Sequence, residues 1–144
     1  LHLSIRRQRQ MCIRDSMQRG VIVLVYMSHK GAVEGYGQTV QDPKTGRLIH
    51  QYMLFAGKAL QWKADGVVVG ATYPEKIEEV HALLKARVPI YSPGVGAQGG
   101  DIEAAVRAGA RFLVIGRAII EAKDIAKTAE RFRNIAQKCL KFKI

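Results

Sequence analysis

Residues 92–101 of this 144-residue chain are Ser-Pro-Gly-Val-Gly-Ala-Gln-Gly-Gly-Asp. Four glycines and a proline in ten residues are typical of a loop whose backbone takes unusual torsion angles and comes close to a ligand. The apolar segment Pro89–Ser92 before it has the length of a strand. After it, Ile102–Ala108 has the pattern of a short helix that Asp101 caps and Gly109 ends. The loop is therefore predicted to join the carboxyl end of a strand to a helix.

The alternation of strand and helix continues on both sides of this loop. Short apolar runs, typical of buried strands, occur at Val21–Met27, Gly66–Gly70, Pro89–Ser92 and Phe112–Gly116. Apolar residues at three- and four-residue spacing predict helices at Leu48–Lys63, from Pro74 onward, at Ile102–Ala108 and at Ile125–Leu140. The first strand, Val21–Met27, is continuously apolar, which predicts burial on both faces of a sheet.

Four consecutive strand–helix units predict an α/β fold with a parallel sheet. Two architectures fit this order, a doubly wound open sheet and a TIM-type (β/α) barrel. A complete eight-unit barrel usually needs about 250 residues. Four units therefore correspond to half of such a barrel, and we assign residues 20–144 to a partial barrel and residues 1–19 to a basic leader.

The leader does not look like part of the fold. Gln10–Ser16 has neither helical nor strand periodicity, and Met-Cys-Ile-Arg-Asp-Ser is what a transposon end used in DNA library preparation encodes. We expect Leu1–Ser16 to be a sequencing scar, with a natural basic leader as the alternative. Sequence of the source genome obtained without adaptors distinguishes the two.

The net charge of +11 raises the question of a nucleic-acid partner. The basic residues gather at the two ends, since residues 1–19 and 121–144 each carry a net +4. The aromatic residues fall on buried-pattern positions and do not interleave with them. We therefore expect no nucleic-acid partner. No apolar run is long enough to predict a membrane span, and two cysteines without a signal peptide favour the reducing cytoplasm.

Two loops have the composition of a phosphate site. The backbone amides of Gln98, Gly99 and Gly100 can converge on an anion at the start of the following helix. Gly116 and Arg117 leave the end of the next strand, and a guanidinium offers paired donors to phosphate oxygens. The loops after the last two strands of a barrel often form such a site. The alternatives are a tight connection without a ligand and a solvated Arg117.

A third candidate segment follows the first strand. Ser28 and His29 stand at its carboxyl end, where barrel enzymes place their working groups. The hydroxyl of Ser28 can donate to or accept from a carbonyl or amide of a ligand. His29 alone is more simply explained as a structural histidine.

Together, Met27–Ala32, Ser92–Asp101 and Gly116-Arg117 resemble the archaeal type of orotidine 5′-monophosphate decarboxylase. The resemblance spans about Gly20 to Phe132 and implies strands five to eight of a barrel of the ribulose-phosphate-binding type. It implies that Ser28 bonds the edge of the pyrimidine ring and that Pro93 lines the pocket beside it. Gln98, Gly116 and Arg117 would then hold the phosphate of orotidine 5′-monophosphate or UMP.

The family resemblance also implies decarboxylation without a metal or organic cofactor, in a homodimer. Its catalytic Asp-x-Lys-x-x-Asp motif does not occur in these residues. Asp42-Pro43-Lys44 has the first spacing, but Arg47 stands where the second aspartate belongs. We therefore expect the catalytic residues upstream of Gly20, and a binding half that is inactive alone. Lys30, where the family often has proline, and the elaborate segment Glu34–Arg47 depart from the pattern.

Two other functions remain open. Another phosphate-binding barrel enzyme, such as a sugar-phosphate decarboxylase, would share the glycine–arginine pair. A non-catalytic phosphate-binding α/β module would share the loops without the chemistry. The motif Asp-x-Lys-x-x-Asp in frame upstream would exclude the module.

Overall fold

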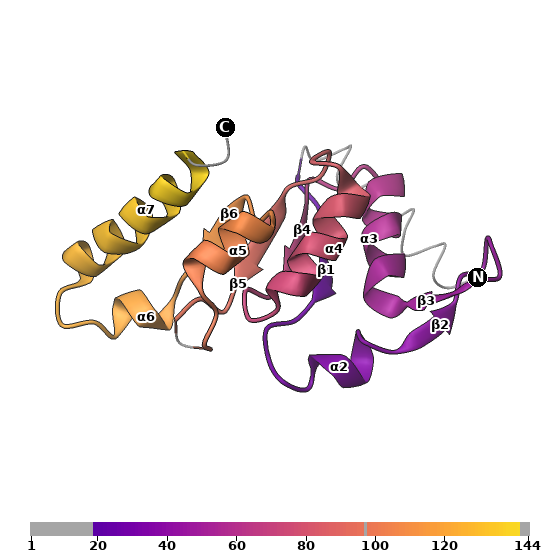
Figure 1. Cartoon of the computed structure of the whole chain (residues 1–144), viewed down its shortest axis with the longest axis horizontal. Helices are drawn as coiled ribbons and strands as arrows, with labels where there is room; N and C mark the ends of the chain where they lie inside the picture. Colours follow the sequence, from indigo (N-terminus) through magenta and orange to yellow (C-terminus); the bar gives the residue numbers. More distant parts are fainter. Residues whose placement is uncertain (1–18, 97, 142–144) are drawn as a thin grey trace.

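Four short apolar strands form one parallel sheet in the computed structural model, which describes residues 19–96 and 98–141 (Figure 1). They are β1 (Ile22–Tyr26), β4 (Gly66–Val69), β5 (Ile90–Pro93) and β6 (Phe112–Val114), paired in the order β1-β4-β5-β6. The four predicted strands are thus confirmed. The predicted scar at Leu1–Ser16 lies outside the described residues.

Helices connect successive strands of this sheet. They are α3 (Gln51–Gln61) between β1 and β4, α4 (Pro74–Leu84) between β4 and β5, and α5 (Ile102–Ala108) between β5 and β6. The short α6 (Arg117–Ile120) and the long α7 (Ile125–Lys141) follow β6. Pro74 occupies the first turn of α4, and the side chain of Asp101 accepts a hydrogen bond from the amide of Ala104 at 2.7 Å, both as predicted.

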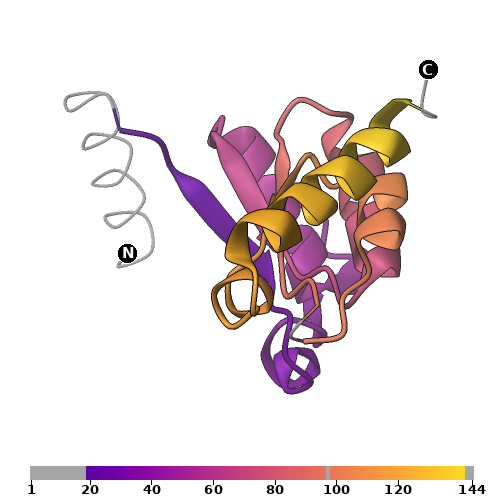
Figure 2. The same cartoon turned by 90° about the vertical axis from the view of Figure 1, so that its left-hand side faces the viewer.

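The strand order decides between the two predicted architectures. Strands paired in chain order, each joined by a right-handed crossover, place every connecting helix on the same face of the sheet. Helix α4 packs against both α3 and α5, so the three connecting helices form one layer. Figure 2 shows β1 and α5 at opposite ends of this arrangement. A doubly wound sheet carries helices on both faces. The arrangement is therefore that of a (β/α) barrel, with four of its strands.

The core lies between the sheet and these helices. Val25, Val67, Val69 and Ile90 are at most 1 % exposed, and they pack against apolar helix residues such as Ile77 of α4. Hydrophobic burial is thus concentrated on the helix side of the sheet.

The other side of the sheet, here called the open face, consists of Ile22, Leu24, Val68, Tyr91, Phe112 and Val114. Leu24, Val68, Tyr91 and Phe112 align in one row across the strands. Ile22 is 51 % exposed and Leu24 40 %, so the prediction that the first strand is buried on both faces is wrong. The sequence pattern fits a strand inside a closed barrel, and the described residues cover only its helix side.

A short helix and a hairpin lie between β1 and α3, in and around the segment Glu34–Arg47. Helix α2 (Ala32–Gly35) is followed by an antiparallel ribbon of β2 (Thr39–Gln41) and β3 (Leu48–His50). The predicted helix at Leu48–Lys63 therefore begins three residues later, at Gln51. Asp42 fixes the turn by accepting hydrogen bonds from the Lys44 amide and the Thr45 hydroxyl, and this local bonding commits Leu48–His50 to strand.

No helix among residues 19–96 and 98–141 is long and apolar enough to cross a membrane.

Candidate phosphate- and base-binding site

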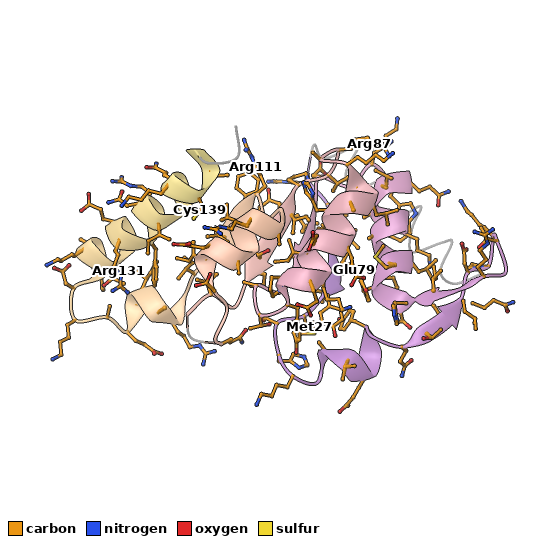
Figure 3. The ribbon with its side chains drawn as sticks, in the orientation of Figure 1. Met27, Glu79, Arg87, Arg111, Arg131 and Cys139 are labelled. Carbon is orange, nitrogen blue, oxygen red and sulfur yellow. The ribbon has the colours of Figure 1, made fainter. Side chains whose placement is uncertain are left out.

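The predicted site residues come from the carboxyl ends of three parallel strands. Ser28 follows β1, Pro93 ends β5, and Gly116 and Arg117 follow β6. Parallel strands place these ends at one edge of the sheet, the lower edge in Figure 1. Figure 3 shows Met27 at this edge, whereas Arg87 and Arg111 lie at the other end of the sheet, too remote to serve the same site.

Gly94 brings Ser28 and Gln98 together. A Cβ on Gly94 would lie 2.8 Å from the Ser28 Cβ and 2.8 Å from the Gln98 Oε1 atom. Gly94 also has a φ of +95°, which side chains other than hydrogen rarely permit. Ser28 and Gln98 therefore both lie close to the position that a Gly94 side chain would occupy, although 70 residues separate them in the chain.

The same loop packs against the start of α6. A Cβ on Gly96 would meet the Ala118 Cβ at 3.0 Å, so the β5–α5 loop touches the helix that begins with Arg117. Gly116 and Arg117 are exposed, and a Cβ on Gly116 would meet no atom within 4 Å. The space beside Gly116 is open to a ligand at the point where the two loops meet.

One predicted feature of the phosphate loop is wrong. The amide of Gly99 donates to the Gly96 carbonyl at 2.9 Å, and the amide of Gly100 donates to the Gly94 carbonyl at 3.1 Å. Both donors serve the loop itself and do not converge on an anion. Of the three predicted amides, Gln98 alone remains a candidate, with its exposed side chain.

The Pro93 ring lies on the open face of the sheet. Pro93 is the register partner of Val114, a residue of the open face, and its carbonyl accepts a hydrogen bond from the Ala71 amide at 2.8 Å. Its ring thus lies on the side of the sheet that a barrel encloses, beside the Ser28 and Gln98 pair.

Thr72 and Tyr73, which the sequence reasoning missed, hold the loop that carries Ser28. The Thr72 hydroxyl donates to the Ser28 carbonyl at 2.8 Å, and the Tyr73 hydroxyl donates to the His29 carbonyl at 3.2 Å. Gly70 allows this contact, because a Cβ there would lie 2.5 Å from the Ser28 Cα. Both residues follow β4 at the carboxyl edge of the sheet. Because barrel enzymes place functional residues at the carboxyl ends of their strands, the sequence could have identified both as candidates.

A charged cluster behind the site joins two helices. The hydroxyl of Tyr52 in α3 donates to Glu79 in α4, and the Lys76 ammonium lies 3.2 Å from the Tyr52 hydroxyl and 3.1 Å from Glu79. The hydrogen bond from Tyr52 lowers the pKa of Glu79. Burial alone would lower the pKa of Lys76, but its hydrogen bonds to Tyr52 and Glu79 outweigh burial and raise it. The cluster fastens α3 to α4, and the Tyr52 ring packs against Tyr26 at the end of β1.

Two further arrangements bear on chemistry. In the described part of the chain, no three histidine, cysteine or acidic side chains gather closely enough to hold a metal ion.

Asp42 and Lys44, which share the spacing of the family's first catalytic pair, belong to the β2–β3 turn. There the hydrogen bond from the Lys44 amide lowers the pKa of Asp42. This pair thus stabilises a turn.

The sequence of this chain is similar to that of a known enzyme family. Residues 7–132 match the sequence profile of the Orotidine 5'-phosphate decarboxylase / HUMPS family. Curated relatives include the orotidine 5'-phosphate decarboxylases of Methanococcoides burtonii, 33 % identical over 83 % of this chain and 51 % of the relative, and Thermomicrobium roseum, 40 % identical over 86 % and 46 %. The chain thus spans about half the length of the relatives it matches.

Solved structures agree on the fold. The orotidine 5'-monophosphate decarboxylase of Methanocaldococcus jannaschii, in complex with the inhibitor BMP, superimposes with a TM-score of 0.71 at 26 % identity. The match covers 86 % of this chain and 52 % of that one. The Sulfolobus solfataricus enzyme gives a TM-score of 0.71 at 23 % identity, which supports the fold alone. With the fold of half a barrel and a profile match over most of its length, this chain belongs to the Orotidine 5'-phosphate decarboxylase / HUMPS family.

Proposed function

We propose that this chain supplies the phosphate- and pyrimidine-binding half of an orotidine 5′-monophosphate decarboxylase, the carboxy-lyase that converts orotidine 5′-monophosphate to UMP and carbon dioxide. The observation that carries the proposal is the convergence of Ser28 and Gln98 around Gly94, with the loop packed on the helix of Arg117. A related enzyme from Methanocaldococcus jannaschii was solved with the inhibitor BMP.

Each residue has a distinct role in this proposal. Arg117 and the backbone at Gly116 bind the phosphate through charge-assisted hydrogen bonds, and Gln98 reaches the same group. Ser28 bonds the ring edge, and Pro93 packs beside the ring. Phosphate binding far from the reacting carbon contributes energy to the transition state at the ring. The 144 residues contain no Asp-x-Lys-x-x-Asp, so we assign binding to them and proton transfer to residues they lack.

The test measures UMP and uridine binding to the purified chain by calorimetry. We expect Arg117→Ala to weaken UMP binding about 10- to 100-fold, the range for losing a hydrogen bond to a charged group, and to leave uridine binding unchanged. Ser28→Ala should weaken both ligands. Arg107→Ala is the matched control, since Arg107 is an exposed arginine paired with Glu103 on the outer helix α5.

A UMP affinity that is insensitive to Arg117→Ala but reduced by Arg107→Ala would contradict the assignment. Loss of the ultraviolet absorbance of orotidine 5′-monophosphate measures turnover, and we expect none from this chain. For the full-length enzyme we propose a homodimer located in the cytoplasm, following the family resemblance.

A further inference from the structure

The segment that carries Ser28 is held at two successive backbone carbonyls. The Ser28 carbonyl accepts a hydrogen bond from the Thr72 hydroxyl at 2.8 Å, and the His29 carbonyl accepts one from the Tyr73 hydroxyl at 3.2 Å. The His29 carbonyl also accepts from the Ala32 amide at 3.1 Å, where the chain turns into α2. Because peptide groups are planar, these bonds fix the orientation of the two peptide groups that follow the Ser28 Cα.

The ring of Tyr73 belongs to a group of packed aromatic rings, here called the tyrosine cluster. At its centre is Tyr26, the last residue of β1, which is 3 % exposed. Its ring meets Tyr73 at a centroid distance of 5.1 Å, Tyr52 at 5.4 Å and Tyr36 at 6.1 Å. The first two pairs are edge-to-face, an arrangement that aromatic rings favour. The cluster therefore holds the Tyr73 ring against the strand that leads directly to Ser28.

The hydroxyl groups of the tyrosine cluster have different partners. The Tyr52 hydroxyl donates to Glu79, between the two helices α3 and α4. Among residues 19–96 and 98–141, Tyr73 is the one member of the cluster whose hydroxyl bonds the segment after β1. Tyr73 thus connects the packed rings to the backbone on which Ser28 stands.

We propose that Tyr73 is a positioning residue for the pyrimidine: its hydroxyl, held in place by the tyrosine cluster, fixes the His29 carbonyl and so the direction in which Ser28 meets the ring edge. This inference rests on the proposed function, in which Ser28 bonds the base. A segment that is fixed before the ligand arrives loses less entropy on binding. The Tyr73 side chain interacts with β1 and the segment after it, whereas Arg117 begins α6, after β6. Tyr73 therefore contributes to the affinity for the base and not to that for the phosphate.

The first test compares the binding of UMP, uridine and ribose 5-phosphate by calorimetry. Tyr73→Phe removes the hydroxyl and keeps the ring. We expect it to weaken UMP and uridine binding about 5-fold, the effect of one hydrogen bond between neutral groups, and to leave ribose 5-phosphate binding and the thermal midpoint unchanged. Tyr36→Phe is the matched control, because it makes the same change in the same cluster at a ring that does not bond the segment.

Three results would overturn the inference: an unchanged affinity of Tyr73→Phe for uridine, an equal loss for ribose 5-phosphate, or the same losses in Tyr36→Phe. The proposed function is tested separately by Ser28→Ala and Arg117→Ala. If these two variants weaken UMP binding as expected and Tyr73→Phe does not, the positioning role alone is wrong. If neither of the two affects UMP binding, the proposed function itself is wrong.

The second test needs no ligand. Hydrogen exchange of the free chain reports how firmly the turn after Ser28 is held. Tyr73→Phe removes one of the two donors to the His29 carbonyl, so we expect the Ala32 amide to exchange about 5-fold faster, with no change in Tyr36→Phe. Unchanged exchange at Ala32 in Tyr73→Phe would show that the hydroxyl does not hold this segment.

Discussion

Gly94 is the residue on which the site geometry depends most directly. Its φ of +95° and the 2.8 Å at which an added Cβ would meet Ser28 and Gln98 leave no room for a side chain. We expect Gly94→Ala to cost roughly 2 kcal/mol in the free energy of unfolding, from backbone strain and displacement of its neighbours. Urea unfolding at a fixed protein concentration measures this cost.

Gly57 provides the matched control. It lies inside α3, and a Cβ there would meet no atom within 4 Å. Gly57→Ala should therefore stabilise the chain by about 0.5–1 kcal/mol, because alanine loses less backbone entropy in a helix. Equal effects of the two substitutions would contradict the special role of Gly94.

Asp101 allows a second prediction at single-residue scale. Its carboxylate accepts from the Ala104 amide at 2.7 Å and so satisfies a donor that the first turn of α5 leaves unpaired. Asp101→Ala should cost about 1 kcal/mol, whereas Asp101→Asn should cost much less because an amide oxygen also caps. If thermal unfolding shows equal losses for both variants, the cap is not what Asp101 contributes.

At the scale of elements, the contact between α3 and α4 should depend on pH. The pKa of Glu79 is lowered in the folded chain, chiefly by the hydrogen bond from Tyr52. A carboxyl with a lowered folded pKa stabilises the fold above its unfolded pKa, and that stability is lost as the pH falls through the folded pKa. The affected range therefore lies below about pH 4.5.

Glu79→Gln measures this contribution. Because the side chain of Glu79 is 44 % exposed, solvent screening limits the loss to about 1 kcal/mol at pH 7. The loss should shrink as the pH falls below the unfolded pKa and through the lowered folded pKa, because the wild-type carboxyl then becomes protonated in the folded chain as well. Glu103→Gln, on the exposed pair with Arg107, is the control and should change stability little at either pH. A loss for Glu79→Gln that does not vary with pH would contradict the coupling.

Sequence patterns predicted some elements better than others, for physical reasons. The strands, the proline at the start of α4 and the Asp101 cap follow from local rules, and all were confirmed. The hairpin was missed because Leu48–His50 continues the apolar spacing of α3, while its pairing with β2 depends on a turn that Asp42 organises. The roles of Thr72 and Tyr73 depend on partners 44 residues away, which periodicity cannot reveal.

For the whole molecule, the one-sided core predicts an asymmetry between the two faces of the sheet. Val67 is fully buried under the helices, and Ile22 is 51 % exposed on the open face. Val67→Ala should cost about 2–3 kcal/mol and Ile22→Ala less than about 1 kcal/mol. Similar costs in chemical unfolding would show that the open face is covered.

The order β1-β4-β5-β6 has a consequence for how the chain acquires its structure. The four strands lie in the sheet in the same order as in the chain. Each strand therefore pairs with the strand of the neighbouring strand–helix unit. No pairing of these four strands closes a loop longer than the one between Ile22 and Gly66, and this limits the loop-closure entropy of each step. Each strand–helix unit can dock on the one before it as it leaves the ribosome, without waiting for a later segment.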